Sequence, residues 1–170
     1  EKRMEQIFDG TALQAVDLLS ASLHGMLTSG ATPWFHLALK DPDIGRDSQV
    51  QEWLETTSLR MMKAFNQSNF ETEIHEMYVD LVVFGTGCMF VEMDNNQLRF
   101  STRHIAEFHI AENQYGLVDT LFRKYKMPAR QAVLRFGYDN ITDYIKKVYE
   151  KKPDEEVTIL HAVLPRYERD

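Results

Sequence analysis

The sequence predicts an α+β fold, with N-terminal amphipathic helices followed by a small, mainly antiparallel sheet, two short helices and a returning C-terminal strand. Apolar residues recur at helical spacing as far as Phe84, whereas short alternating runs follow Gly87. The last alternating run comes after Pro153, which ends a short lysine-rich helix. We therefore expect residues 1–170 to form one α+β fragment of a longer chain, helical over about 1–86 and built from the sheet and short helices over about 87–170.

Composition is typical of a globular protein. With 170 residues, 44% of them hydrophobic, the chain can form one core or two small ones. Its net charge of -7 argues against a surface that neutralises nucleic-acid phosphates. The single cysteine, Cys88, excludes an intramolecular disulfide and a multi-cysteine zinc site. No apolar run reaches the ~20 residues that span a bilayer, so no membrane contact is expected.

The first half predicts two helices joined by an extended segment. The first helix runs from Ile7 to about Leu27, with a capping box at Thr11–Gln14. The turn residues of Thr28–Pro33 halt it, and the apolar segment Trp34–Leu39 is expected to be extended or strand-like. The second helix runs from Ser48 to about Asn66. Its apolar face is expected to comprise Val50, Trp53, Leu54, Thr57, Met61 and Phe65.

A third helix leads through two glycines into a strand. Ser68 and Glu71 are spaced as a capping box at its start, and Gly85 with Gly87 ends it. Because glycine adopts positive φ without strain, these two residues are predicted to be a structural hinge. The strand Cys88–Met93 follows directly.

The sequence pattern after Gly87 predicts antiparallel strands. A turn at Asp94–Asn96 leads into Gln97–Phe100, and Glu107–Ile110 and Leu117–Met127 have the same alternating character. We expect these runs to pair in one sheet.

The last part predicts two short helices and a strand. Pro128 suits the first position of a helix that ends at Gly137, and Asn140 is expected to cap the next one. Val157–Val163 then alternates as a strand that returns to the same sheet.

The histidines do not predict a metal site. His75-Glu76 lacks the second histidine that a zinc-protease helix needs four residues later, because position 79 is Val. His104 and His109 are separated by an odd number of residues, which on a strand directs them to opposite faces. We expect solvated or packed histidines and no cofactor or metal ligand.

Two further sites have a catalytic and a structural interpretation. Cys88 follows a glycine turn and could be a nucleophile, but no motif places a base beside it, so we expect a buried structural thiol. Gly85-Thr86-Gly87 resembles part of a phosphate-binding loop, yet such loops follow a strand and open a helix, the reverse of the order here. No catalytic residue is predicted.

Two surface predictions remain open. Arg123–Arg135 is the densest basic stretch, interleaved with aromatic residues, and it is either a solvated face or a nucleic-acid contact. Trp34 and Phe35 are either core residues or aromatic anchors of a subunit interface.

Several short motifs follow one another over nearly the whole chain: Phe8–Thr11, Pro33–Leu37, Ser68–Phe70, Phe84–Gly87 with Glu92, Val118–Arg123, and Ala129–Gln131 before Phe136-Gly137. Their order resembles the portal proteins of short-tailed bacteriophages and prophages, also called head-to-tail connector proteins. One departure is Pro128, where a small hydroxyl residue is expected ahead of Ala-Arg-Gln.

The resemblance implies a structural, non-enzymatic role in viral capsid assembly, DNA packaging and genome ejection. Such subunits form a homo-oligomeric ring, typically dodecameric, at one capsid vertex of the virion, after assembly in the host cytoplasm. The implied partners are other copies of the chain, capsid and scaffold proteins, the terminase, and tail or adaptor proteins. DNA passes through the channel, and regions outside this chain would make most contacts with it, because this fragment would belong to the outer, wing-like part.

Two other classes of function stay open from the residues alone. One is a nucleic-acid-binding adaptor that uses Arg123–Arg135, and the other is a thiol enzyme that uses Cys88. Salt-dependent DNA binding would favour the first, and loss of function in Cys88→Ser would favour the second.

Overall fold

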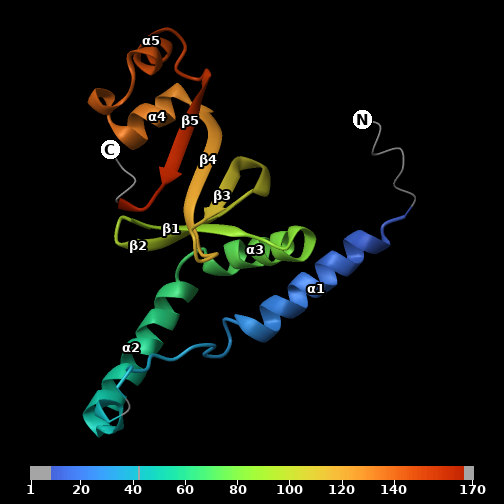
Figure 1. Cartoon of the computed structure of the whole chain (residues 1–170), viewed down its shortest axis with the longest axis vertical. Coiled ribbons are helices and arrows are strands. Elements are labelled where there is room, and N and C mark those ends of the chain that lie inside the picture. Colours follow the sequence, from blue (N-terminus) through green and yellow to red (C-terminus); the bar gives the residue numbers. More distant parts are fainter. Residues whose placement is uncertain (1–8, 42, 167–170) are drawn as a thin grey trace. The chain divides into compact units, whose positions relative to one another are not determined.

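The chain forms two compact units, Glu1–Ile105 and Ala106–Asp170, here called the N-terminal and C-terminal units. The computed structural model (Figure 1) describes residues 9–41 and 43–166. Helices and small antiparallel sheets make up both units, which confirms the predicted α+β class. The charge is divided unevenly: the N-terminal unit has 15 acidic and 8 basic residues, against 11 of each in the C-terminal unit.

Three helices occupy the N-terminal unit, as predicted: α1 (Thr11–Leu27), α2 (Ser48–Asn66) and α3 (Phe70–Phe84). The predicted capping box at Thr11–Gln14 is wrong, because Gly10 is the N-cap and no side chain caps α1. Instead, the Asp9 carboxylate accepts a hydrogen bond from the Thr11 N–H at 3.1 Å, and Thr11 is already helical. The predicted start at Ile7 lies outside the described residues.

The buried face of α2 differs from the predicted one. Asp47 caps the helix by accepting from the N–H groups of Gln49 and Val50, at 2.8 and 3.3 Å. The buried positions are Leu54, Ser58 and Met62, whereas Trp53, predicted on the apolar face, is 62% exposed. Serine is polar, so the hydropathy pattern does not place Ser58 on the apolar face. In the structure the Ser58 hydroxyl is hydrogen-bonded inside the unit, and the residue is buried.

The start of α3 also differs in detail. Asn69 is its N-cap, and the Ser68–Glu71 capping box does not form. Ser68 accepts from the Phe70 N–H at 3.1 Å and donates to the Phe65 carbonyl at 2.7 Å, so it joins α2 to α3. The predicted end is confirmed, since Gly85 is the C-cap.

Strands β1 (Cys88–Asp94) and β2 (Gln97–Arg103) form a two-stranded antiparallel sheet. Asn95 and Asn96 have φ values of 48° and 65°, the positive φ at both central residues that a tight two-residue hairpin requires. The predicted turn at Asp94–Asn96 is therefore confirmed, and asparagine suits it because it tolerates the left-handed region better than other side chains.

The core of the N-terminal unit lies where α3 meets β2. Its buried members are Phe70, Ile74, Tyr78 and Phe100, and partly buried residues of α1, α2 and β1 pack around them. The segment Trp34–Leu39, predicted to be extended or strand-like, lies in neither a helix nor a strand.

The C-terminal unit contains a second sheet. Strands β3 (Phe108–Glu112), β4 (Val118–Pro128) and β5 (Glu156–Val163) pair antiparallel in the order β3-β4-β5. The return of β5 is thus confirmed, but the prediction of one sheet is wrong, because β1 and β2 form a separate sheet. Alternation of side chains reveals strands and cannot reveal which strands pair.

Helices α4 (Ala129–Phe136) and α5 (Asp143–Lys151) lie between β4 and β5 in the sequence. Pro128 sits at the N-cap of α4, one residue before the predicted position. The predicted role of Asn140 is wrong: its amide donates to the Phe136 carbonyl at 2.9 Å, and Thr142 is the N-cap of α5. Together with β5 they bury Ala129, Ala132, Ile141, Ile145 and Val157. Short 3-10 turns lie at Ile44–Arg46, Ile105–Glu107 and Tyr138–Asn140.

Candidate assembly site

The junction between α3 and β2 is fixed by an asparagine that mimics a strand. The Asn69 Oδ1 accepts from the Phe100 N–H at 2.9 Å, and its Nδ2 donates to the Phe100 carbonyl at 2.8 Å. These two bonds satisfy the main-chain groups of a residue that is only 4% exposed. Asn69 therefore pairs with β2 at its outer edge, as a neighbouring strand would.

Glu73, one turn further along α3, extends this pairing. The Thr102 N–H donates to the Glu73 carboxylate at 2.5 Å, and the Thr102 hydroxyl donates to the Glu73 carbonyl at 2.6 Å. Neither Asn69 nor Glu73 was predicted, because an asparagine before a helix indicates a local cap and carries no sign of a partner 31 residues away. The result is a helix held to a sheet by four polar contacts.

The predicted hinge residues Gly85 and Gly87 have different environments. Gly85 has a φ of 75°, its N–H donates to the Leu81 carbonyl at 2.9 Å, and a Cβ there would meet open space. At Gly87 a Cβ would lie 2.9 Å from Met77 Cγ and 3.4 Å from the Met77 carbonyl oxygen. Backbone conformation thus requires glycine at position 85, and close packing against α3 requires it at position 87.

The predicted interface pair Trp34 and Phe35 lies in an aromatic cluster. The Trp34 ring stacks on Phe70 with 5.7 Å between centroids and a 10° interplanar angle, and the Phe35 ring meets Phe65 edge-on at 5.8 Å. Phe100 completes the cluster, 5.1 Å from Phe70. Both predicted anchors are half-buried, so they pack inside the unit while part of each surface stays accessible.

The end of α1 is tied to α3. The hydroxyls of Thr28 and Tyr78 share a buried hydrogen bond of 3.1 Å, and Ser20 of α1 is completely buried. The Thr28–Tyr78 bond and the packing of Leu23 against the core thus hold the end of α1 to α3, which leaves its opposite side exposed to solvent.

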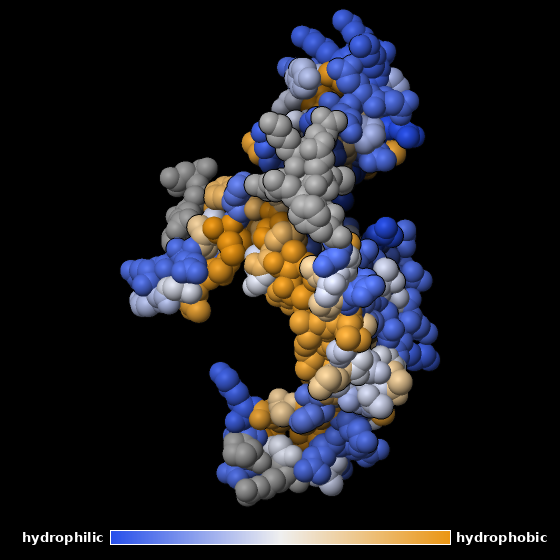
Figure 2. All heavy atoms as spheres, turned by 90° about the vertical axis from the view of Figure 1, so that its right-hand side faces the viewer, coloured by the Kyte–Doolittle hydropathy of each residue, from blue (hydrophilic) through white to orange (hydrophobic). Residues whose placement is uncertain are grey.

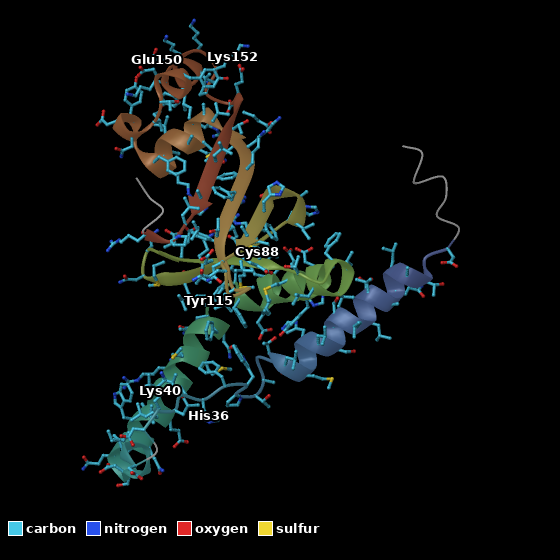
Figure 3. The ribbon with its side chains drawn as sticks, viewed as in Figure 1. His36, Lys40, Cys88, Tyr115, Glu150 and Lys152 are labelled. Atoms are coloured by element: carbon cyan, nitrogen blue, oxygen red, sulfur yellow. The ribbon has the colours of Figure 1, made fainter. Side chains whose placement is uncertain are left out.

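The structure does not assemble a catalytic or metal site from the predicted candidates. Cys88 is half-buried at the start of β1, opposite Arg103 in the strand register (Figure 3). His75 lies beside His24 with 5.7 Å between ring centroids, and His104 packs against a phenylalanine ring. Among the described residues, no group of three or more His, Cys, Asp or Glu side chains could hold a metal ion.

Residues 9–41 and 43–166 contain no helix that is long and apolar enough to cross a membrane.

At least three of the five basic residues in the Arg123–Arg135 stretch are paired with carboxylates. Arg123 pairs with Glu107 at 2.7 Å and lies over the Tyr125 ring at 3.8 Å. Arg130 pairs with Asp154 at 2.7 Å. Another pair, Lys126 with Glu156, is longer at 3.6 Å and mostly exposed. A phosphate group that approached Arg123, Lys126 or Arg130 would compete with these carboxylates.

One hydroxyl in the C-terminal unit has a perturbed pKa. Tyr138 donates to Glu150 at 2.9 Å. This hydrogen bond, followed by desolvation and the Glu150 charge, raises the pKa of Tyr138 above its ordinary value. The contact is exposed and joins α5 to the turn before it.

Comparison with known proteins gives a consistent result. A family model described as "Bacteriophage head to tail connecting protein" matches residues 1–170. The portal protein of Salmonella phage epsilon15 is 37% identical over 172 residues, which cover 100% of this chain and 31% of that protein. The probable portal protein of Bordetella phage BPP-1 is 33% identical over 172 residues, with the same coverage. The chain thus spans about a third of the length of these curated relatives.

Proposed function

The chain belongs to the family of bacteriophage head to tail connecting proteins, and on that premise we propose that it is part of a structural subunit of a portal ring. The observation that carries the proposal is the family match along the whole chain, joined by two portal relatives at 33% and 37% identity. In this role the subunit sits at one vertex of the virion capsid, and DNA is packaged and ejected through the ring. Capsid and scaffold proteins, terminase and tail or adaptor proteins are the proposed partners.

Contacts within the N-terminal unit support this role. A ring of identical subunits closes only if every subunit keeps the same shape. The contacts from Asn69 and Glu73 to β2 hold α3 in one position, and the buried aromatic rings fill the space beneath it. These contacts favour a subunit of fixed shape, which is the wedge that ring closure requires.

The Gly85 and Gly87 hinge sets the angle between α3 and β1 in this proposal. Gly85 turns the chain in the left-handed region, and Gly87 lets β1 leave α3 in close contact. An altered angle would change the wedge and hence the closure of the ring. Trp34 and Phe35 remain candidates for the subunit interface through their accessible edges.

Electron microscopy of the full-length protein tests the proposed function. We expect closed rings of uniform subunit number, which native mass spectrometry can count. Gly85→Val combined with Gly87→Val should yield open or irregular assemblies, because both backbone requirements are violated. Monomers or open filaments from the unmodified protein would contradict the proposed function, whereas normal rings from the double variant would contradict only the role of the hinge.

A further inference from the structure

One side of α1 is apolar and exposed to solvent. We call it the α1 face and define it by Ala15, Leu18, Leu19, Ser22 and Met26, which recur at helical spacing on the side away from Ser20. Leu18 is 72% and Met26 is 83% exposed. Ser22 donates its hydroxyl to the Leu18 carbonyl at 2.7 Å, which satisfies its donor within the helix. The helix is about 25 Å long, at 1.5 Å per residue.

The α1 face also lacks charge. Asp17 is the sole charged residue between Gly10 and Leu39, and it lies outside the face. Helices at the surface of a soluble protein usually carry charged residues on the solvent side. Figure 2 shows apolar side chains gathered where α1 lies. An exposed apolar face of this kind marks a contact with another protein.

A second, mainly apolar surface lies beside α2. We call it the α2 groove: a cavity of about 490 Å³ between α2 and the extended segment before it, lined mainly by Phe35, Leu37, Leu39, Leu54, Glu55 and Leu59. Figure 3 shows His36 and Lys40 on this segment beside the helix. Its volume lies within the range of about 300–1,000 Å³ that is usual for ligand pockets, so several aliphatic side chains fit into it.

Hydrogen bonds fix the segment that borders the α2 groove. The Leu37 N–H donates to the Ser58 hydroxyl at 2.9 Å, and that hydroxyl donates to the Leu54 carbonyl at 2.8 Å. The extended segment is therefore pinned to α2 at its middle. The groove is preformed and does not have to open when a partner binds.

The charge of the N-terminal unit indicates what fits these two surfaces. With 15 acidic and 8 basic residues, two copies of this unit repel each other wherever charged surfaces meet. Copies can come together most easily through surfaces without charge. The α1 face is a ridge and the α2 groove is a hollow, and of their defining residues only Glu55 is charged.

We propose that the α1 face of one copy docks into the α2 groove of the next copy. The two surfaces are unlike, so the contact is head-to-tail, and repetition of such a contact closes a ring when the rotation fits. The proposal rests on the proposed function as a ring subunit and names the surfaces through which copies meet. Leu18 and Met26 are the side chains that enter the groove.

Cysteine cross-linking in the full-length protein tests this pairing. In a Cys88→Ser background, Leu18 or Met26 is changed to Cys together with Leu39→Cys or Leu59→Cys, and the rings are oxidised. A disulfide needs Cα atoms about 4.4–6.8 Å apart, so a docked ridge should link in at least one of the four combinations. We expect a ladder of covalent multimers on a non-reducing gel that collapses on reduction.

Matched variants distinguish the other outcomes. Leu18→Cys with Leu134→Cys is the control, because Leu134 is 85% exposed and lies outside both surfaces. Cross-linking by Leu18→Cys alone would indicate symmetric pairing of two α1 faces and would overturn the proposal. Closed rings that none of the four combinations cross-links would overturn the pairing and leave the ring function intact. Absence of rings in the unmodified protein would overturn both.

Discussion

Replacement of Asn69 by alanine is the most direct test of how the N-terminal unit is held together. Its side chain bonds both main-chain groups of Phe100 at 2.8 and 2.9 Å. Asn69→Ala removes both bonds, together with the longer bond of 3.3 Å from the Asn69 amide to the Glu73 carboxylate. The effect therefore reports mainly on the strand-like pairing of Asn69, because the two bonds to Phe100 are the shorter ones.

The expected loss of stability follows from those two bonds. Each contributes about 0.5–1.5 kcal/mol net, and a buried N–H or C=O left without a partner costs about 1–3 kcal/mol. Phe100 is 4% exposed, so water reaches its main chain poorly. We expect Asn69→Ala to lower the free energy of unfolding by about 2–4 kcal/mol.

Tryptophan fluorescence during urea unfolding provides a specific assay. Both tryptophans of the chain, Trp34 and Trp53, lie in the N-terminal unit, and Trp34 stacks on Phe70, the residue after Asn69. With a denaturant slope of about 2 kcal/mol per M, the midpoint should fall by about 1–2 M urea.

Asn66→Ala is the matched control for this prediction. The Asn66 amide makes one exposed hydrogen bond, to the Gly30 carbonyl at 3.2 Å, so its loss should cost less than about 1 kcal/mol. If Asn69→Ala changes the free energy of unfolding by no more than Asn66→Ala does, the strand-like role assigned to Asn69 is wrong.

Two further predictions concern close packing and pH. Gly87→Ala should destabilise the N-terminal unit by about 1–3 kcal/mol in urea unfolding, because the new Cβ would contact Met77 Cγ. Met77→Ala in the same chain should recover part of that loss. Strictly additive effects of the two changes would contradict the packing role. Glu150→Gln should lower the pKa of Tyr138 toward its ordinary value near 10, measured by ultraviolet titration of tyrosinate after subtraction of a Tyr138→Phe titration. Because the pKa of Tyr138 is raised in the folded state, the stabilisation by this contact is present below the unfolded pKa and is lost as pH rises through the folded pKa. An unchanged titration midpoint of Tyr138 in Glu150→Gln would refute Glu150 as the cause of the raised pKa.

Local patterns predicted the helices and strands well for a physical reason. Helical spacing, the glycines after Phe84 and the asparagines of the β1–β2 turn depend on neighbours within a few residues. The α+β class and the boundaries near Gly85 and Gly137 were predicted correctly on that basis.

Caps and buried faces were harder to predict. Ser68 has the spacing of a capping box but joins α2 to α3, and Trp53 has the spacing of a core residue but faces solvent. In both cases the local sequence was compatible with more than one arrangement of the side chain. Contacts between elements selected one of them.

The sequence by itself determined the class of fold, the order of its elements and the family to which the chain belongs, because periodicity, turn residues and motif order are properties of the chain. Only the tertiary structure decided that the strands form two sheets and that Asn69 pairs with Phe100. It also decided that α1 exposes an uncharged ridge to solvent and that a preformed groove lies beside α2. These features depend on which surfaces pack against one another across distances of tens of residues. Hydropathy marks a side chain as apolar, but packing determines whether it is buried in the core or left for a partner.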